Sequence, residues 1–273
     1  MIHVPRRGAV PAPLAGPDSL AARERAANEQ ALREGRPLSF KVYRHEVVKA
    51  RLCELFNFKC AYCESDIRAT APGDVEHFRP KGKITVRGAD GKVQSRPGYP
   101  WLAAEWSNLL LSCTFCNSPN KQQVRSLPKR TLGKANWFPL ADERRRAKTP
   151  RQVAREPRLL LDPCTDKPEQ HLAFTPEGDI QPRRVRGKPS AMGEATIETC
   201  GLARIGLMQR RAAHRRIVES LILDIRDAIE AGRPPARKLA LLTELMAAGS
   251  DYAAFTRSLV RAQLGPWLRR LGL

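Results

Sequence analysis

The sequence predicts an α+β protein that is mainly helical, with a zinc-stapled ββα module between N-terminal helices and a helical C-terminal region. Two CxxC pairs bracket one segment that contains a histidine and another that contains asparagines. Apolar residues recur at helical spacing on both sides of this part of the chain. The expected divisions are an N-terminal extension with one helix (1–38), the module (39–156) and the C-terminal region (157–273).

The composition favours a polyanionic partner. The 273 residues include 48 Lys and Arg against 28 Asp and Glu, a net charge of +20 at pH 7. Such a charge attracts nucleic acid, although arginines spread over solvated helices are an alternative interpretation. No apolar run approaches the ~20 residues of a membrane span, and the first residues lack the apolar core of a signal peptide. We therefore expect a cytoplasmic protein.

Two helices are predicted before the first cysteine pair. Asp18 is the expected N-cap of the first helix, which ends at Gly35. The second is expected to start at Phe40 and to bury a stripe of apolar side chains, namely Val42, Val47, Leu52, Leu55 and Phe56. On this helix Cys53 is predicted to be a small buried hydrophobe and His45 a surface residue.

Four cysteines form the strongest signal in the sequence: Cys60, Cys63, Cys113 and Cys116. Zinc binds four ligands in a tetrahedron, and each CxxC turn supplies two thiolates. In a reducing compartment, paired CxxC motifs are more often metal ligands than disulfides. The segment between the pairs is longer than the ~15–20 residues of simple zinc ribbons, so it must contain folded structure. We predict a structural zinc bound by all four thiolates, in preference to two unrelated cysteine pairs or a redox pair.

A second group of candidate site residues lies between the cysteine pairs. A short strand is predicted over residues 74–78, which presents Asp74, Glu76 and His77. A neutral imidazole can take a proton from water, and carboxylate oxygens favour hard divalent cations. Strict alternation would place Glu76 and His77 on opposite faces, so a shared site requires the strand to end or bulge here.

The remaining candidates surround this strand in the sequence. Asn108 begins an apolar run that predicts a second strand, and Asn117 follows the last cysteine at the start of a predicted helix. Residues 82–98 are polar and rich in turn formers, which predicts a hairpin or loop. The basic side chains Arg79, Lys81 and Lys83 would line the approach to His77, as phosphate contacts or as ordinary solvated residues.

With CAYC, VEHFRPK, SNLLLSCTFCN and a following lysine, the sequence resembles the HNH endonuclease family. The resemblance implies that His77 is the general base and that Asn108 braces the loop carrying it. It also implies that Asn117 binds the catalytic metal and that Lys121 lies near the phosphate. The spacing from Asn117 to Lys121 is one residue longer than the commonest form in the family.

The resemblance implies a one-metal reaction in which nucleic acid, with DNA favoured, is cut to leave 5′-phosphate and 3′-hydroxyl ends. The catalytic metal would be Mg²⁺ or Mn²⁺, bound by Asn117 together with Glu76. The family more often has Asp where this chain has Glu76, so Asp74 is the alternative ligand. Zinc would be structural, because a closed shell of four thiolates leaves no position for substrate.

The C-terminal region has a different pattern. A β-hairpin that turns at Glu177-Gly178 is followed by a long helical region over 190–231, interrupted near Gly201 and Gly206. Its expected buried stripe is Ile217, Leu221, Ile222, Ile225 and Ile229. Two more helices are predicted over 236–248 and 251–264. Four residues lack partners at ligand spacing and are assigned to packing or to the surface: Cys164, Cys200, His171 and His214.

The joint pattern of CAYCE, VEHFRPK, YPWLAAEWSNLLLSC, FPL, LLLDP, PEQHLAF and TIETCGL resembles an HNH subgroup from bacterial anti-phage systems. Septu-type nuclease subunits and retron-associated nucleases belong to it, and the likeness covers roughly residues 45–215. It implies an ATPase partner of the SMC-like or ABC-like class. Two other functions stay open: a non-catalytic zinc module that binds nucleic acid, and a toxin or a nuclease directed at RNA or tRNA.

Overall fold

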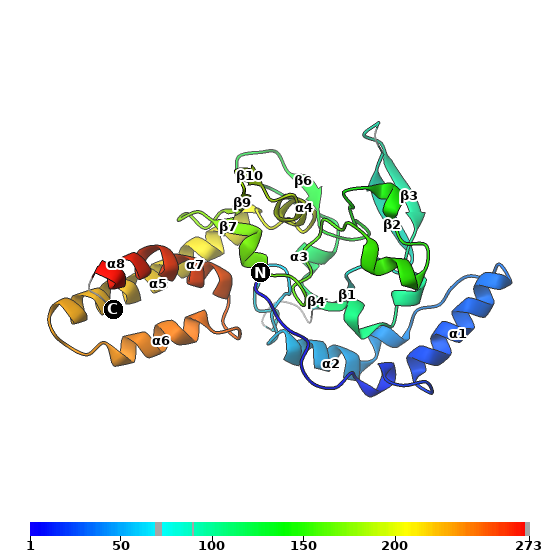
Figure 1. Cartoon of the computed structure of the whole chain (residues 1–273), viewed down its shortest axis with the longest axis horizontal. Coiled ribbons are helices and arrows are strands. Elements are labelled where there is room, and N and C mark those ends of the chain that lie inside the picture. Colours follow the sequence, from blue (N-terminus) through cyan, green and yellow to red (C-terminus); the bar gives the residue numbers. More distant parts are fainter. Residues whose placement is uncertain (69–72, 89, 271–273) are drawn as a thin grey trace.

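The chain folds into an α+β structure, known from a computed structural model that describes residues 1–68, 73–88 and 90–270 (Figure 1). The helices are α1 (Leu20–Arg33), α2 (Glu46–Leu55), α3 (Thr114–Asn117), α4 (Ala191–Thr199), α5 (Ile205–Glu230), α6 (Ala236–Met246), α7 (Ala253–Gln263) and α8 (Gly265–Arg270). Short 3-10 helices span Ala12–Leu14, Val42–Arg44, Pro100–Leu102, Trp106–Asn108, Glu143–Arg145, Pro150–Arg155 and Pro168–Gln170.

The strands form five antiparallel pairs: β1 (Asp74–His77) with β4 (Leu109–Ser112), β2 (Lys83–Arg87) with β3 (Val93–Pro97), β5 (Asn120–Gln122) with β6 (Arg130–Leu132), β7 (Leu172–Phe174) with β8 (Ile180–Pro182), and β9 (Arg184–Val185) with β10 (Lys188–Pro189). Helices α5 to α8 gather at one end of the molecule, α1 extends away at the other, and the β2–β3 hairpin projects outward (Figure 1).

The two N-terminal helices form close to their predicted positions. The N-cap of α1 is Ser19, whose hydroxyl accepts a hydrogen bond from the Ala22 amide at 3.1 Å, so the prediction of Asp18 was wrong by one residue. The second helix is broken at His45, which caps α2 by accepting from the Val47 amide at 3.2 Å. This break rotates the helix, so that Val48 is buried and the predicted core residue Val47 is 44% exposed.

The predicted strand pair at the centre of the module is present. Asp74 lies opposite Ser112 and His77 opposite Leu109 in the β1–β4 pair, and α2 packs against β4. The helix expected to begin at Asn117 is absent from this position: α3 is a single turn that ends there. Pro119 follows closely, and a residue before proline is pushed out of the helical region, so the chain turns into the β5–β6 hairpin instead.

The C-terminal region contains the predicted hairpin and helices. The hairpin joins β7 to β8, and the helical region is interrupted between α4 and α5, near Gly201 as predicted. Gly206 lies inside the first turn of α5, so the second expected interruption was wrong. The buried stripe contains Ile222 and Ile225, whereas Ile217 is 58% exposed.

Buried apolar residues form one cluster that draws on all three predicted divisions, from Met1 to Leu264, and the division boundaries stay predictions. In the part of the chain that the structure describes, no helix combines the length and apolar character needed to cross a membrane.

Candidate functional site

The four cysteines of the two CxxC pairs converge on one point. Their sulfur atoms all lie within 4.8 Å of one another, and the Sγ atoms of Cys63 and Cys113 are 3.8 Å apart. All four are free thiols rather than disulfides. The first pair forms a turn after α2, and the second brackets the start of α3, with Cys113 as its N-cap. An all-sulfur set of this size fits the tetrahedral coordination that zinc prefers.

Hydrogen bonds hold the two cysteine turns together. The Ala61 amide donates to the Leu111 carbonyl of β4 at 2.8 Å, which joins the first turn to the strand leading into the second. The buried Arg204 donates through Nη1 to Cys116 Sγ at 3.4 Å. Contacts with the Cys113 and Cys116 sulfurs lower the pKa of the Cys63 thiol well below its usual range. Contacts with the other cysteine sulfurs instead raise the pKa of the Cys116 thiol, so zinc binding, which needs all four thiolates, would release protons.

A cavity of about 690 Å³ opens beside the cysteine cluster, at the C-terminal end of β1. Asp74, Glu76, His77 and Asn117 all line it. Glu76 and His77 share this cavity, whose lining includes all four residues of β1, and β1 ends at His77. Four basic side chains also line it, from two distant parts of the chain: Arg44, Lys49, Lys81 and Lys83.

His77 is buried and held in one orientation. Its Nε2 lies 2.8 Å from the Ala103 carbonyl, which can only accept, so Nε2 carries the proton. Its ring meets the Tyr43 ring edge-on at 4.5 Å. The other ring nitrogen, Nδ1, lies 3.4 Å from the Lys81 ammonium. Burial, with the charge of Lys81 second, lowers the pKa of His77 to about 3, so the imidazole is neutral at pH 7 and the lone pair of Nδ1 can accept a hydrogen bond from the Lys81 ammonium.

The two asparagines have different surroundings. Asn108 is buried and binds the backbone after His77: its Oδ1 accepts from the Arg79 amide at 2.8 Å, and its Nδ2 donates to the Arg79 carbonyl at 2.9 Å. Asn117 donates through Nδ2 to Asp74 Oδ2 at 3.1 Å. Because the amide nitrogen is used in this way, the amide oxygen of Asn117 is the atom that could bind a cation.

Glu76 is paired with a lysine that the sequence patterns did not single out. The Lys134 ammonium lies 2.5 Å from Glu76 Oε1 and donates to the His77 carbonyl at 2.8 Å. Burial raises the pKa of Glu76, and the charge of Lys134 opposes this effect. Glu76 thus faces the cavity with one carboxylate oxygen already engaged, whereas Asp74 is hydrogen-bonded to Asn117.

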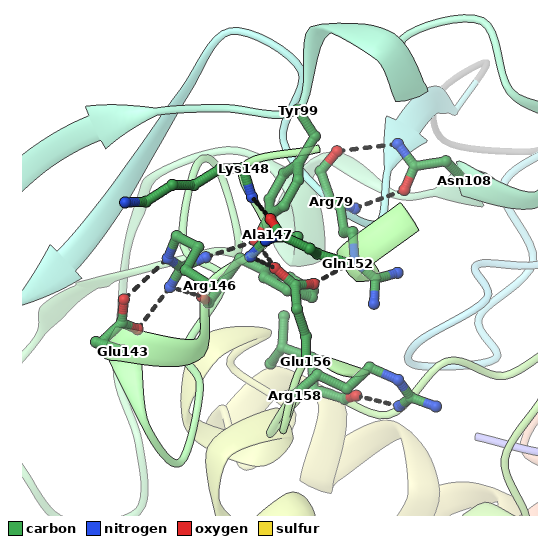
Figure 2. A network of polar contacts seen from close by, with 12 residues as sticks. Arg79, Tyr99, Asn108, Glu143, Arg146, Ala147, Lys148, Gln152, Glu156 and Arg158 are labelled. Carbon is green, nitrogen blue, oxygen red and sulfur yellow. Dashed lines mark hydrogen bonds and ion pairs between the residues drawn. The ribbon is translucent and has the colours of Figure 1, made fainter. Parts of the chain in front are cut away.

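Arg79 takes part in a buried network rather than lining the cavity (Figure 2). Its Nε donates to Glu156 Oε2 at 2.8 Å, and its side chain is only 14% exposed. Oxygen Oε1 of Glu156 accepts from the Tyr99 hydroxyl at 2.7 Å and from the Ala147 amide at 2.8 Å. Arg79 therefore lies outside the cavity lining, because a buried carboxylate holds its guanidinium, and its contact with nucleic acid stays a prediction.

Lys81 and Lys83 line the cavity as expected, while Lys121 lies exposed on β5, outside the cavity lining. Tyr43, Arg44, Lys49 and Lys134 belong to the site but were not predicted. The first three precede the cysteine motif and the fourth follows it, so no local pattern marked them. Among the described residues, the only group of three or more Cys, His, Asp and Glu side chains close enough for a shared metal is the cysteine cluster.

Comparison with known proteins gives one extended similarity. Over 213 residues the chain is 37% identical to the Septu protein PtuB of Bacillus mycoides (strain KBAB4), a match that covers 78% of this chain and 66% of that protein. The chain is a relative of the Septu protein PtuB. It spans just under two thirds of the length of that relative. No family model matches the chain.

Two shorter similarities are also to proteins named Septu proteins. The chain is 31% identical over 118 residues to a Septu protein PtuB of Bacillus thuringiensis, which covers 43% of this chain and 36% of that protein. It is also 30% identical over 162 residues to a Septu protein PtuA of Bacillus mycoides, which covers 58% of this chain and 19% of that much longer protein. These similarities support the Septu part of the resemblance seen in the sequence.

Proposed function

We propose that this chain is a metal-dependent HNH endonuclease that hydrolyses phosphodiester bonds in DNA. The observation that carries the proposal is a neutral His77 in a cavity of about 690 Å³ that is lined by four basic side chains. A general base must be unprotonated at the working pH, and a polyanionic substrate needs positive charge around it. The cavity offers both within one site.

His77 would take the proton from the attacking water. Its Nε2 proton is committed to the Ala103 carbonyl, so the lone pair on Nδ1 is the acceptor. Lys81, next to Nδ1, would bind the scissile phosphate and keep the imidazole neutral until it receives the proton. Asn108 would keep the backbone after His77 in place through its two hydrogen bonds to Arg79.

The site also has oxygen ligands for a divalent cation. Asn117 could bind Mg²⁺ or Mn²⁺ through its amide oxygen, with Glu76 as the second ligand and Asp74 as the alternative. A cation there would supply Lewis-acid stabilisation of the negative charge on the departing 3′ oxygen.

The test is cleavage of supercoiled plasmid by the purified zinc-loaded protein with Mg²⁺ or Mn²⁺. We expect wild-type protein to nick or linearise the plasmid, and His77→Ala to lose at least ~10²-fold in rate. His171→Ala is the matched control, because His171 bonds Ser190 and lies outside the cavity lining. Equal cleavage by wild type and His77→Ala would refute the general base. Cleavage of total RNA but not plasmid would replace DNA by RNA as the substrate.

We also propose that the chain is the nuclease component of a Septu-type anti-phage defence system and works with an ATPase partner. Support comes from its similarity to proteins named Septu protein PtuB and Septu protein PtuA. Co-expression with the product of a neighbouring ATPase gene should give a complex that survives affinity purification. It should also lower phage plaque numbers only when His77 is intact. Protection that persists with His77→Ala would contradict a nuclease role in defence.

A further inference from the structure

Lys134 has the most unusual environment of the charged side chains around the cavity. Its side chain is 0% exposed, and both groups that its ammonium binds belong to the candidate catalytic centre. One is the Glu76 carboxylate at 2.5 Å, and the other is the His77 carbonyl at 2.8 Å. One ammonium therefore connects the two neighbouring residues that the proposed chemistry needs.

The backbone around Lys134 is fixed to the end of α3. The Lys134 amide donates to the Cys116 carbonyl at 2.8 Å, and the Ala135 amide donates to the Asn117 carbonyl at 2.5 Å. Gly133 makes this approach possible: at its φ of +123° a side chain is strained, and a Cβ atom would lie 2.0 Å from the Ser118 carbonyl oxygen. Lys134 thus joins the zinc cluster, Asn117, Glu76 and His77.

A buried ammonium is costly unless its partners compensate for the lost water. Desolvation of a single ion costs several kcal/mol in a real protein, and removal of one partner leaves an uncompensated charge. For Lys134, the Glu76 carboxylate and the His77 carbonyl compensate for the lost water. Replacing the pair with apolar residues would be a simpler way to fill this space, which indicates that the charge has a role beyond packing.

We propose that Lys134 is a positioning residue of the catalytic centre, a resident cation that fixes the Glu76 carboxylate and the His77 peptide and limits how tightly Glu76 binds a divalent metal. The catalytic part of this inference rests on the proposed nuclease function. The metal part does not, because it concerns only competition between two cations for one carboxylate. An ammonium at Oε1 repels an incoming divalent ion and shares the negative charge that would attract it.

The test compares Mn²⁺ binding and cleavage by zinc-loaded wild-type protein and Lys134→Met. Mn²⁺ binding is followed by electron paramagnetic resonance without nucleic acid. We expect the Mn²⁺ dissociation constant of Lys134→Met to fall by on the order of tenfold, because the competing charge is gone. We expect kcat for plasmid cleavage to fall by ~10²-fold, because Glu76 and His77 are no longer held in place. Tighter metal binding with slower turnover is a combination that simple loss of structure cannot produce.

Lys134→Gln is the second variant, since it removes the charge but keeps a hydrogen-bond donor for the His77 carbonyl and is easier to fold. Its Mn²⁺ dissociation constant should fall as well. Lys59→Met is the matched control. Lys59 is also a buried lysine, but its ammonium donates to the Ser250 carbonyl, and we expect its loss to lower stability without changing Mn²⁺ affinity.

Unchanged or weaker Mn²⁺ binding by a folded, zinc-containing Lys134 variant would overturn the inference, even if wild-type protein cleaves plasmid. Tighter Mn²⁺ binding in a protein that never cleaves nucleic acid would support the metal part of the inference and refute the proposed function together with the catalytic part. The two failures are thus distinguishable.

Discussion

The cysteine cluster and the His77 cavity lie side by side, yet they are built in opposite ways. The cluster uses one residue type from two short turns, and its four sulfur atoms lie within 4.8 Å of one another. The cavity takes its lining from five segments: 40–49, 73–77, 80–83, 117–119 and 135–136. A local motif thus defines the cluster, whereas the fold assembles the cavity.

The cavity depends on the cysteine cluster for its shape, whereas the cluster does not depend on the cavity. Asn117 directly follows Cys116 and ends the same helical turn, and Lys134 is bonded to the Cys116 carbonyl. Among the described residues, none of the four cysteine sulfurs is hydrogen-bonded to a side chain of the cavity lining, and the first cysteine turn is joined to β4 by backbone hydrogen bonds. Loss of the cluster should therefore destroy the cavity, whereas damage to the cavity should leave the cluster intact.

The largest effect should come from Cys113→Ser, which breaks the tetrahedral set. Structural zinc supplies on the order of 10 kcal/mol of folding free energy in small zinc-binding domains, so we expect loss of bound zinc and of cooperative unfolding in the module. Elemental analysis and thermal circular dichroism measure this. Cys53→Ser is the control, because Cys53 is a free thiol on α2 outside the cluster and should cost no more than ~1 kcal/mol. Retained zinc in Cys113→Ser would contradict a four-thiolate site.

A smaller effect, confined to the cavity, is expected for Asn108→Ala. This change leaves the Arg79 amide, the Arg79 carbonyl and the Leu102 carbonyl without their buried partner, which should lower the free energy of unfolding by about 2–4 kcal/mol. Zinc content should stay at the wild-type level while plasmid cleavage falls. Chemical denaturation and elemental analysis give the two readouts.

Asn28→Ala is the matched control for Asn108. Asn28 makes the same two-way contact with the Ser39 backbone, donating at 2.7 Å and accepting at 2.8 Å, but at the surface. Its loss should cost about 1 kcal/mol or less, because water replaces the lost partner. If Asn108→Ala released zinc, the one-directional dependence would be wrong.

The same contrast explains how much of the structure could be predicted. The cysteine cluster, the β1–β4 pair, the β2–β3 and β7–β8 hairpins and most helices follow from the spacing and periodicity of residues that lie close together in the sequence. The site residues Asp74, Glu76, His77 and Asn117 were placed in one region because the motif keeps them close to the cysteines. These features depend on local chemistry that a sequence pattern records.

Other features could not be predicted, because they depend on contacts across the fold. Arg44 and Lys49 reach the cavity only because α2 packs against β4, and Lys134 reaches Glu76 and the His77 carbonyl only because Gly133 lets the chain approach Ser118. Arg79 has the composition of a phosphate contact but binds Glu156, which lies far along the chain and is buried. The charge of a side chain predicted its chemistry but not its partner.

The low pKa of His77 gives a prediction for pH. The folded-state pKa of about 3 lies below the ordinary value of about 6.5, so between these values the unfolded chain binds a proton that the folded chain does not. The free energy of unfolding should therefore fall as the pH drops from about 6.5 toward 3, by up to ~1.4 kcal/mol per pH unit from this residue. Urea denaturation of wild-type protein and His77→Gln at pH 7, 6 and 5 measures the difference.

In His77→Gln this contribution is absent, so the stability advantage of wild-type protein over the variant should shrink as the pH falls. Other titrating groups are common to both proteins and cancel in the comparison. Parallel pH dependences would mean that the pKa of His77 is the same in the folded and the unfolded chain, which would contradict the lowered pKa.

The smallest effect should come from Lys49, a basic residue of the cavity lining that the sequence did not predict. Lys49→Ala removes one cation of the lining and should leave the free energy of unfolding within about 0.5 kcal/mol of wild type. DNA binding is measured in proteins that also carry His77→Ala and are therefore catalytically inactive. Lys49→Ala should weaken the binding of all DNA sequences alike, and the slope of log K against log salt concentration should decrease in magnitude by about 1. Lys129→Ala is the control, since Lys129 is exposed outside the cavity lining. An equal loss for both lysines would assign DNA binding to the overall charge of +20 rather than to the cavity.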